Sequence, residues 1–289
     1  MASHQPDTRS VVREGAPRSH ADAAHDDAAA ASRDGALHRA AAVLRLLATA
    51  GRRGLALTDL AKAAGLPNST MHRLLQQLQD ERLAMRIESS RHYTVGPLAY
   101  EIGLAAAQQF DIRGLLRPAL EALAREAGET AYLIMRSGDE AVCIDVAEGP
   151  TPLRVVTLHI GSRRPLGLGA GGLAILSALP PDERKGILEN VTARIERHWG
   201  FPPELLAQSL EEATRRGHAV IRNRVNPGVT AVGMPFFDSL GQVIGAVTVA
   251  AANARMETAR LAQLQQLLAR TSRELRDALS GHQWRRRED

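Results

Sequence analysis

The sequence predicts a protein of the α+β class, in which a helical N-terminal part precedes a part built from antiparallel strands and helices. Two observations support this prediction. Residues 55–85 show the apolar spacing of a helix twice, with a tight turn between the two runs. Farther along the chain, strand-like runs come in pairs around short turn sequences, with helical runs on either side. The chain has 289 residues, enough for two folded parts that each have a core.

Residues 55–85 predict two short helices that cross at a tight turn. Gly65 suits a turn with positive φ, Pro67 stops the first helix, and Asn68 or Ser69 is expected to cap the second. An ordinary helical hairpin would show the same pattern. The positions expected to face the core are Leu57, Leu60, Ala61 and Ala64 in the first helix, and Met71, Leu74, Leu75 and Leu78 in the second.

The remaining faces of the second helix are rich in hydrogen-bonding side chains and carry little charge. Arginine can pair with guanine, glutamine can pair with adenine, and a hydroxyl near a helix start can reach phosphate. Residues 85–96 alternate around a Ser89-Ser90 turn and predict a short β-hairpin, or wing. We therefore expect this unit to bind the major groove of double-stranded DNA. The expected base contacts are Thr70, His72, Arg73 and Gln76, and the expected phosphate or minor-groove contacts are Ser69, Arg86 and Arg91, with Asn68 also at the interface.

The distribution of charge agrees with a DNA-binding segment. Residues 36–97 carry 9 Lys and Arg against 4 Asp and Glu, whereas residues 98–289 carry 23 against 22. Excess positive charge in one segment is what contact with phosphates requires. An amphipathic helix over residues 36–49 is expected to pack against the DNA-reading helix through Leu37, Ala41, Val43, Leu44 and Leu47.

Composition limits the other classes of function. Residues 1–35 are rich in small and polar side chains and predict a disordered tail, and residues 282–289 predict a basic tail. Cys143 is the single cysteine, so it fits a reducing cytoplasm and is expected to be a buried strand residue. No run reaches the roughly 20 apolar residues of a membrane-spanning helix. The ten histidines lack metal-ligand spacing. We therefore expect a cytoplasmic protein without a metal or cofactor.

The second half of the chain alternates predicted strands and helices. Residues 98–112 are small and apolar and predict a linker helix that also packs in a dimer. Two hairpins are expected, one around Ser137-Gly138-Asp139 and one around residues 238–241. The expected strands are 131–135, 140–146, 153–158, 231–237 and 242–251, and the expected helices are 113–128, 181–190, 203–216 and 255–279, with a further helix after a glycine-rich loop near residue 169.

The chain resembles the IclR family of bacterial transcriptional regulators. In residues 36–97 the resemblance rests on LHRAAAVLRLLA, LTDLAKAAGLPNSTMHRLLQQL and RHYTVGP, and after them on RPALEALAREAGET and YLIMRSGDEAVCIDVAEG. It implies a winged helix-turn-helix over 36–97, a linker helix over 98–112 and a GAF-like effector-binding domain with an antiparallel sheet over 113–281. It also implies a homodimer that in many members pairs on one operator, and repression as the commoner output.

The glycine-rich stretch at residues 167–172 admits three interpretations. Its spacing matches G-x-G-x-x-G, and Glu189 stands at a suitable distance for a dinucleotide site, but such a site needs a preceding strand in a βαβ unit, and hairpins surround this stretch. A flexible loop before a helix is the plain alternative. The family resemblance implies instead that Gly169, Ala170 and Gly171 line an effector pocket, where N–H groups at the helix start hold a carboxylate or similar anion.

Residues 217–238 align with the pocket signature of the family but differ at the ligand positions. Acidic residues are usual in the family where Ile221 and Arg224 stand, and its common lysine is replaced by Leu173. In members that bind small oxo-acids, polar groups contact the ligand at the positions of Ile221 and Ala231, and Thr248 is the nearest hydroxyl that remains. Apolar walls leave the polar atoms of a small acid unpaired. We therefore expect a larger, more apolar effector, such as an aromatic acid.

Two other classes of function compete with a regulator. An enzyme fused to a DNA-binding domain could use Asp145, His159 and Ser162 as a triad, although no G-x-S-x-G motif supports a nucleophile and no catalytic residue is assigned. An architectural DNA-binding protein with a degenerate sensor is the third class. DNA affinity that depends on an effector separates the three, because only the regulator shows it without consuming the effector.

Overall fold

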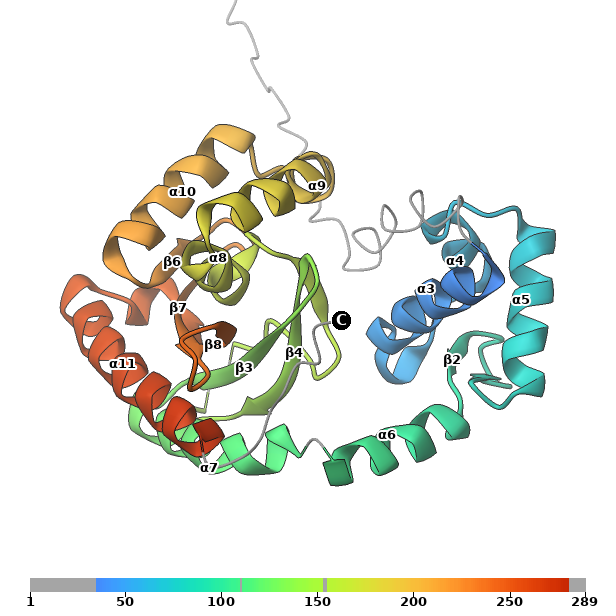
Figure 1. Ribbon diagram of the computed structural model, residues 1–289, viewed down its shortest axis with the longest axis horizontal. Coiled ribbons are helices and arrows are strands. Elements are labelled where there is room, and N and C mark those ends of the chain that lie inside the picture. Colours follow the sequence, from blue (N-terminus) through green and yellow to red (C-terminus); the bar gives the residue numbers. More distant parts are fainter. Residues whose placement is uncertain (1–34, 110, 153–154, 281–289) are drawn as a thin grey trace, which may run out of the picture.

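The computed structural model describes residues 35–109, 111–152 and 155–280. Two folded bodies are joined by a helix, with the N-terminal body on the right of Figure 1 and the C-terminal body on the left. The two predicted tails lie, apart from Gly35, outside the described residues. None of the described helices is long and apolar enough to cross a membrane.

The N-terminal body is a three-helix unit followed by a small antiparallel hairpin. Its elements are α3 (Ala36–Thr49), η1 (Gly51–Arg53), α4 (Leu57–Ala63), α5 (Asn68–Asp80), β1 (Ala84–Arg86) and β2 (Tyr93–Val95). Val43, Leu60, Met71 and Leu75 are fully buried in one cluster between the helices. Leu37 was expected in this core but is 84% exposed, because it lies in the first turn of α3, before the helix reaches the cluster.

The turn between α4 and α5 follows the sequence prediction in one respect and not in another. Gly65 has φ +57°, as the turn requires. The prediction that Asn68 or Ser69 caps α5 is wrong, because Pro67 is the N-cap and no side chain bonds the first turn. Extended backbone at Pro67, with ψ 145°, sets the direction of the helix and leaves both polar side chains exposed.

The end of α5 is fastened to the helix that joins the two bodies. α6 (Pro97–Gln109) begins beside the chain turn that follows α5, where the Leu98 N–H donates to the Arg82 carbonyl at 3.0 Å. The Arg82 guanidinium also pairs with Glu101 of α6 at 2.7 Å. Gly96 lies so close that a Cβ there would stand 2.2 Å from the Arg82 carbonyl oxygen. The start of α6 is therefore held against the chain turn that follows α5.

The C-terminal body is a six-stranded antiparallel sheet with helices on both faces. The strands run in the order β5 (Arg163–Pro165), β4 (Glu140–Ala147), β3 (Thr130–Ser137), β8 (Val243–Ala252), β7 (Val229–Phe237), β6 (Ala219–Arg222). One face packs against α8 (Gly169–Ala178), α9 (Pro181–Trp199) and α10 (Pro203–Arg216). The other face packs against α7 (Ile112–Ala127) and α11 (Thr258–Ser280), so that the sheet separates two cores (Figure 1).

Three strand and helix predictions need correction. Residues 155–158 of the predicted strand 153–158 form a loop, and residues 153–154 lie outside the described residues. The Tyr132 hydroxyl forms hydrogen bonds with the Val155 carbonyl and the Thr157 N–H, the groups that would otherwise pair with a neighbouring strand. The edge strands β5 and β6 were missed, since each is too short to show alternation. The helix predicted near 181–190 continues to Trp199.

Candidate functional site

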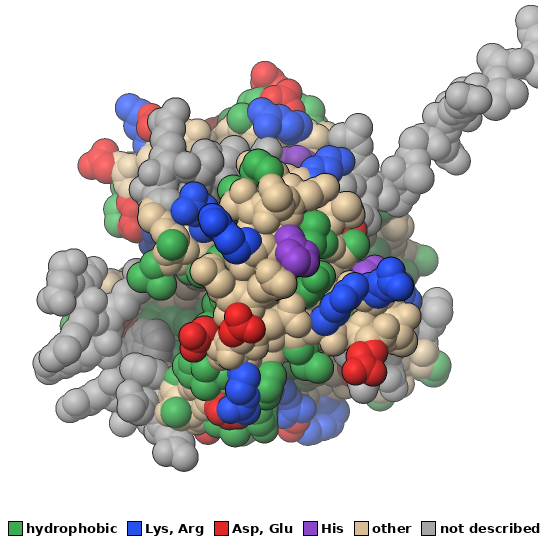
Figure 2. Space-filling model, turned by 90° about the vertical axis from the view of Figure 1, so that its right-hand side faces the viewer, with side chains coloured by type: hydrophobic (Ala, Val, Ile, Leu, Met, Phe, Trp, Pro, Cys, Tyr) green, Lys and Arg blue, Asp and Glu red, His purple; other side chains and the backbone are tan. Residues whose placement is uncertain are grey.

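The second helix of the N-terminal body presents the polar face that its sequence predicts. Met71, Leu75 and Leu78 point into the core, whereas the polar side chains on the opposite side are exposed. Figure 2 views the molecule from the side on which α5 lies in Figure 1 and shows mostly backbone and uncharged side chains in tan, with Lys, Arg and His side chains and a few Asp and Glu side chains spread across the face. Of the predicted DNA contacts on α5, Asn68, Ser69, His72, Arg73 and Gln76 are exposed, and Thr70 is half-buried.

The hairpin after α5 holds the two predicted cationic contacts. Arg86 is exposed, and its guanidinium lies 5.9 Å from the centroid of the Tyr93 ring, which is itself buried. Arg91 is exposed beside the hairpin turn, with φ +61°. An isolated β-bridge between Leu55 and Tyr93, with hydrogen bonds in both directions, anchors the hairpin to the loop before α4. The hairpin is therefore a wing fixed to the helical unit, with both arginines on its surface.

The C-terminal body contains a pocket between the sheet and the start of α8. It has about 620 Å³ of atom-free space, which includes the part that is open to solvent. All six residues that the sequence predicts for an effector line it, namely Gly169, Ala170, Gly171, Ile221, Ala231 and Thr248. Ile221 and Ala231 lie opposite each other on β6 and β7. Arg222 and Arg224 do not line this pocket.

Close packing explains the glycines at the start of α8. A Cβ added at Gly171 would lie 2.8 Å from Ile134 Cγ1, and one added at Gly233 of β7 would lie 2.5 Å from the Ala170 carbonyl oxygen. The glycines let the first turn of α8 lie directly on β3, β7 and β8. This stretch therefore forms a tightly packed helix start and not a flexible loop. Leu173, which replaces the common lysine of the family, is buried in the same core.

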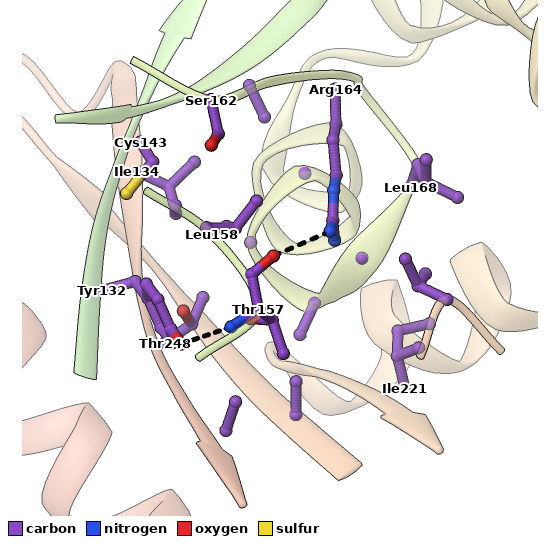
Figure 3. A pocket seen from close by; sticks show the side chains of 18 of the residues that line it. Tyr132, Ile134, Cys143, Thr157, Leu158, Ser162, Arg164, Leu168, Ile221 and Thr248 are labelled. Carbon is purple, nitrogen blue, oxygen red and sulfur yellow. Dashed lines mark hydrogen bonds between the residues drawn. The ribbon is translucent and has the colours of Figure 1, made fainter. Parts of the chain in front are cut away.

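Arg164 was missed as a pocket residue by the sequence analysis. It lies on β5 with only 7% of its surface exposed, and its Nη2 donates to the Thr157 carbonyl at 3.1 Å. Burial lowers the pKa of Arg164 from 12.5 to about 10, so the side chain remains a cation at neutral pH. Figure 3 shows the guanidinium extending into the pocket beside Thr157 and the loop at Leu158. The available signal was the doublet of Arg163 and Arg164, which only Pro165 and Leu166 separate from Gly167, because neighbours in a strand point to opposite faces.

Tyr132 and Cys143 complete the polar part of the wall and were also missed as pocket residues. The Tyr132 hydroxyl donates to the Val155 carbonyl at 3.0 Å and accepts from the Thr157 N–H at 2.9 Å, and so holds the 155–158 loop over the pocket. Burial raises the pKa of both groups, that of the Cys143 thiol to about 12. Cys143 is a buried strand residue as expected, and in addition it faces the pocket.

The structure does not form the two alternative catalytic or cofactor sites. The Asp145 carboxylate accepts from Arg117 and pairs with Arg113, both on α7, while the contact between His159 and Ser162 uses the His159 backbone N–H. The three residues therefore make no triad. Every strand pair in the described sheet is antiparallel, so the glycine motif at 167–172 lies in no βαβ unit. No group of three potential metal ligands occurs among the described residues.

A winged helix-turn-helix joined through one helix to a pocket-bearing α/β domain defines a class of two-domain transcriptional regulators. The family model for the IclR helix-turn-helix domain matches residues 36–86, and the model for the C-terminal domain of the bacterial transcriptional regulator IclR matches residues 104–277. The chain belongs to the IclR family of transcriptional regulators.

Relatives and a solved structure agree with this assignment. The transcriptional regulator KipR of Bacillus subtilis is 32% identical over 212 residues, which are 73% of this chain and 84% of KipR. The acetate operon repressor of Salmonella typhimurium is 26% identical over 78% of this chain and 84% of that protein. An IclR homologue from Microbacterium hydrocarbonoxydans, crystallised with 4-hydroxybenzoate, has the same fold with a TM-score of 0.64 at 19% identity, covering 85% of this chain and 99% of that one.

Proposed function

We propose that this regulator represses transcription from an operator that α5 reads in the major groove, and that a small apolar acid in the pocket controls its affinity for that operator. The exposed polar face of α5 carries the proposal for DNA. Thr70, His72, Arg73 and Gln76 contact base edges, while Asn68 and Ser69 lie at the helix start, where phosphate binds well. Arg86 and Arg91 of the wing hold phosphate or reach the minor groove.

The DNA-binding form is a homodimer, because one short reading helix covers only a half-site. Support for a dimer comes from α6, where several apolar side chains are left exposed by the described residues of the single chain. Tyr100, Ile102 and Leu104 are 69%, 54% and 50% exposed, and residues 105–107 beside them are exposed alanines. Such a surface is typical of an interface between protein chains. A second copy of α6 supplies the cover and sets the distance between the two reading helices.

Effector control requires that the ligand bind one arrangement of the dimer better than the other. The contacts of Arg82 with Leu98 and Glu101 support a route for this coupling, since they connect the end of α5 to α6. α6 in turn leads into α7, which packs on the sheet that bears the pocket. A ligand that shifts α6 therefore alters the spacing of the two reading helices.

The apolar pocket supports an effector with an apolar body. Ile134, Leu158, Leu168 and Ile221 form much of its wall, so a ligand with an apolar body buries more apolar surface there than a two- or three-carbon acid can. Because the homologue from M. hydrocarbonoxydans was crystallised with 4-hydroxybenzoate, aromatic acids are the first compounds to test.

Fluorescence anisotropy on the DNA upstream of the protein's own gene tests the proposed function. The binding is titrated with salt and repeated with aromatic acids, aliphatic acids, glyoxylate and pyruvate. We expect specific binding with a steep salt dependence that one aromatic or aliphatic acid weakens. Specific binding that no compound changes would identify an architectural protein, and consumption of a compound would identify an enzyme. Control by glyoxylate or pyruvate alone would contradict the proposed class of effector.

The dimer has a separate test with a matched control. Leu104→Glu places a charge on the exposed apolar face of α6, and Leu240→Glu places the same charge on an 81% exposed leucine in the turn between β7 and β8. In sedimentation equilibrium we expect Leu104→Glu to weaken dimerisation by about 10-fold or more, since a buried charge at an interface costs more than about 1.4 kcal/mol. Leu240→Glu is expected to behave like the wild type. Equal behaviour of both variants would place the interface elsewhere.

A further inference from the structure

The pocket holds a buried positive charge for which the described residues supply no counter-charge. Only 7% of the surface of Arg164 is exposed. Among the described residues it pairs with no carboxylate. Its neighbour in the strand, Arg163, pairs with Glu140 at 2.7 Å. The Arg164 Nε is buried, and the part of the chain that the structure describes offers it no hydrogen-bond partner. A buried arginine without a carboxylate is costly, so its retention in the wall of a cavity points to a ligand.

The Arg164 guanidinium lies against the start of α8, and each of these two groups attracts an anion. α8 begins at Gly169, and a Cβ added there would stand 3.4 Å from Arg164 Nη1. No side chain caps the first turn of α8. Unpaired N–H groups at a helix start carry partial positive charge. An anion in the pocket in front of both would therefore accept from the guanidinium and from backbone N–H groups together.

The rest of the pocket carries no other charge. Among the described lining residues Arg164 is the only one with a charged side chain, and the polar remainder consists of hydroxyls, one thiol and Asn226. Burial holds the Tyr132 phenol and the Cys143 thiol in their neutral forms, because it raises the pKa of both. A second negative charge on a ligand would have no cation to meet it. The site thus balances a single negative charge.

We propose that Arg164 and the first turn of α8 form a carboxylate subsite, which selects monocarboxylates with an apolar body over neutral and dianionic analogues. This inference rests on the proposed effector pocket and goes beyond it by naming the residue that selects charge. The carboxylate lies on the pocket side of the guanidinium and of the first turn of α8, while the apolar body lies toward Ile221 and Ala231. Arg164 is a specificity-determining residue of the effector-binding domain, and its role follows from its buried position in the pocket wall beside the start of α8.

Calorimetry on the full chain without DNA tests this proposal. The probes are two sets of acids with their matched analogues: benzoate, benzamide and terephthalate, and hexanoate, hexanamide and adipate. We expect at least one monocarboxylate to bind about 10-fold or more tightly than its amide and its dicarboxylate, as expected for hydrogen bonds to a charged partner. Equal affinity of acid and amide would overturn the proposal, as would the failure of both monocarboxylates to bind at millimolar concentration.

Three variants separate charge selection from folding. Arg164→Gln is expected to weaken monocarboxylate binding about 10- to 100-fold and to change amide binding by less than about 3-fold. Arg164→Lys keeps the charge and is expected to recover part of the affinity. Arg163→Gln removes an equal charge from the neighbouring position, outside the pocket lining, and is expected to bind acids like the wild type. An Arg164→Gln variant that binds the acid as tightly as the wild type would overturn the proposal.

Failure of the carboxylate subsite can be distinguished from failure of the proposed function, because ligand binding is measured without DNA. If an effector controls operator binding but Arg164→Gln does not change its affinity, the carboxylate subsite is wrong and the regulator stands. If monocarboxylates bind through Arg164 but never change operator affinity, the subsite stands and effector control is wrong. Should the Arg164 variants not fold, the comparison of acid, amide and dicarboxylate on the wild type still decides.

Discussion

The face of α5 and the pocket at α8 both present the first turn of a helix, but under opposite conditions. On α5 the polar side chains are exposed and point away from a buried apolar stripe. At α8 the helix start is buried, its first residues are glycine and alanine, and the polar groups come from other elements such as β3 and β5. A surface helix thus contacts its ligand with its own side chains. A buried helix start contributes only backbone N–H groups, and the side chains that contact the ligand come from neighbouring strands.

This difference decides how each site fails when it is altered. A polar side chain on α5 contributes nothing to the core, so its removal affects binding alone. A residue around α8 belongs both to the pocket and to the core, so its change affects folding as well. The following predictions test this contrast, from the largest expected effect to the smallest.

The largest effect is expected at the contact between β7 and α8. Gly233→Ala places a Cβ 2.5 Å from the Ala170 carbonyl oxygen, and we expect a loss of about 3 kcal/mol or more in the free energy of unfolding from the overpacking. Gly186→Ala in α9 meets nothing within 4 Å and is expected to be neutral or stabilising by up to about 1 kcal/mol. Urea unfolding followed by circular dichroism measures both. Similar midpoints for the two variants would show that the sheet and α8 separate easily.

On the reading face, Arg73→Ala is expected to cost about 1–3 kcal/mol of operator binding and to relax specificity at one base pair, with no loss of stability. Arg215→Ala removes the same charge from an exposed position on α10 and serves as the control. Anisotropy on operators with single base-pair changes gives the result. An equal loss on every sequence would make Arg73 a phosphate contact instead.

Tyr132→Phe tests the loop that covers the pocket. The change leaves the Val155 carbonyl and the Thr157 N–H without their partner, and we expect a loss of about 1–3 kcal/mol in the free energy of unfolding. Tyr100 is 69% exposed on α6, so Tyr100→Phe is expected to change stability by less than about 0.5 kcal/mol. Denaturant titration of the two variants distinguishes them, and equal stability would mean that water replaces the hydroxyl.

The smallest effect on stability at neutral pH is expected from the buried Cys143 thiol, which chemical modification tests. Burial raises the pKa of Cys143 from 9.0 to about 12, so the folded chain at about pH 8 holds roughly 1,000-fold less thiolate than the unfolded chain. Iodoacetamide is therefore expected to modify Cys143 only after unfolding. Because the thiol ionises more readily in the unfolded chain, its contribution to stability falls only above about pH 9. As a control, a cysteine introduced at exposed position 69 in a Cys143→Ala background is expected to react in the folded protein at the rate of a solvent-exposed thiol. Mass spectrometry measures the modification of the wild type and of this variant.

The sequence predicted the reading helix, the wing, both central hairpins and the six pocket positions, because each depends on patterns within a few residues or on family resemblance. It missed β5 and β6, which gain their strand geometry only by pairing with β4 and β7. It also assigned a strand to the 155–158 loop, where the side chain of Tyr132 takes the place of a neighbouring strand. Local patterns cannot show such a substitution, since the partner lies more than twenty residues away.

By itself the sequence determined the helix-turn-helix, its polar face and the glycines at the start of α8, because helix periodicity, turn geometry and the absence of a Cβ are local properties. Only the tertiary structure decided that Arg164 is buried while Arg163 is paired, and that Ile221 meets Ala231 across two strands. The physical reason is that burial and charge balance depend on which distant segments surround a side chain. The residue proposed to select the ligand's charge therefore becomes visible only in the folded chain.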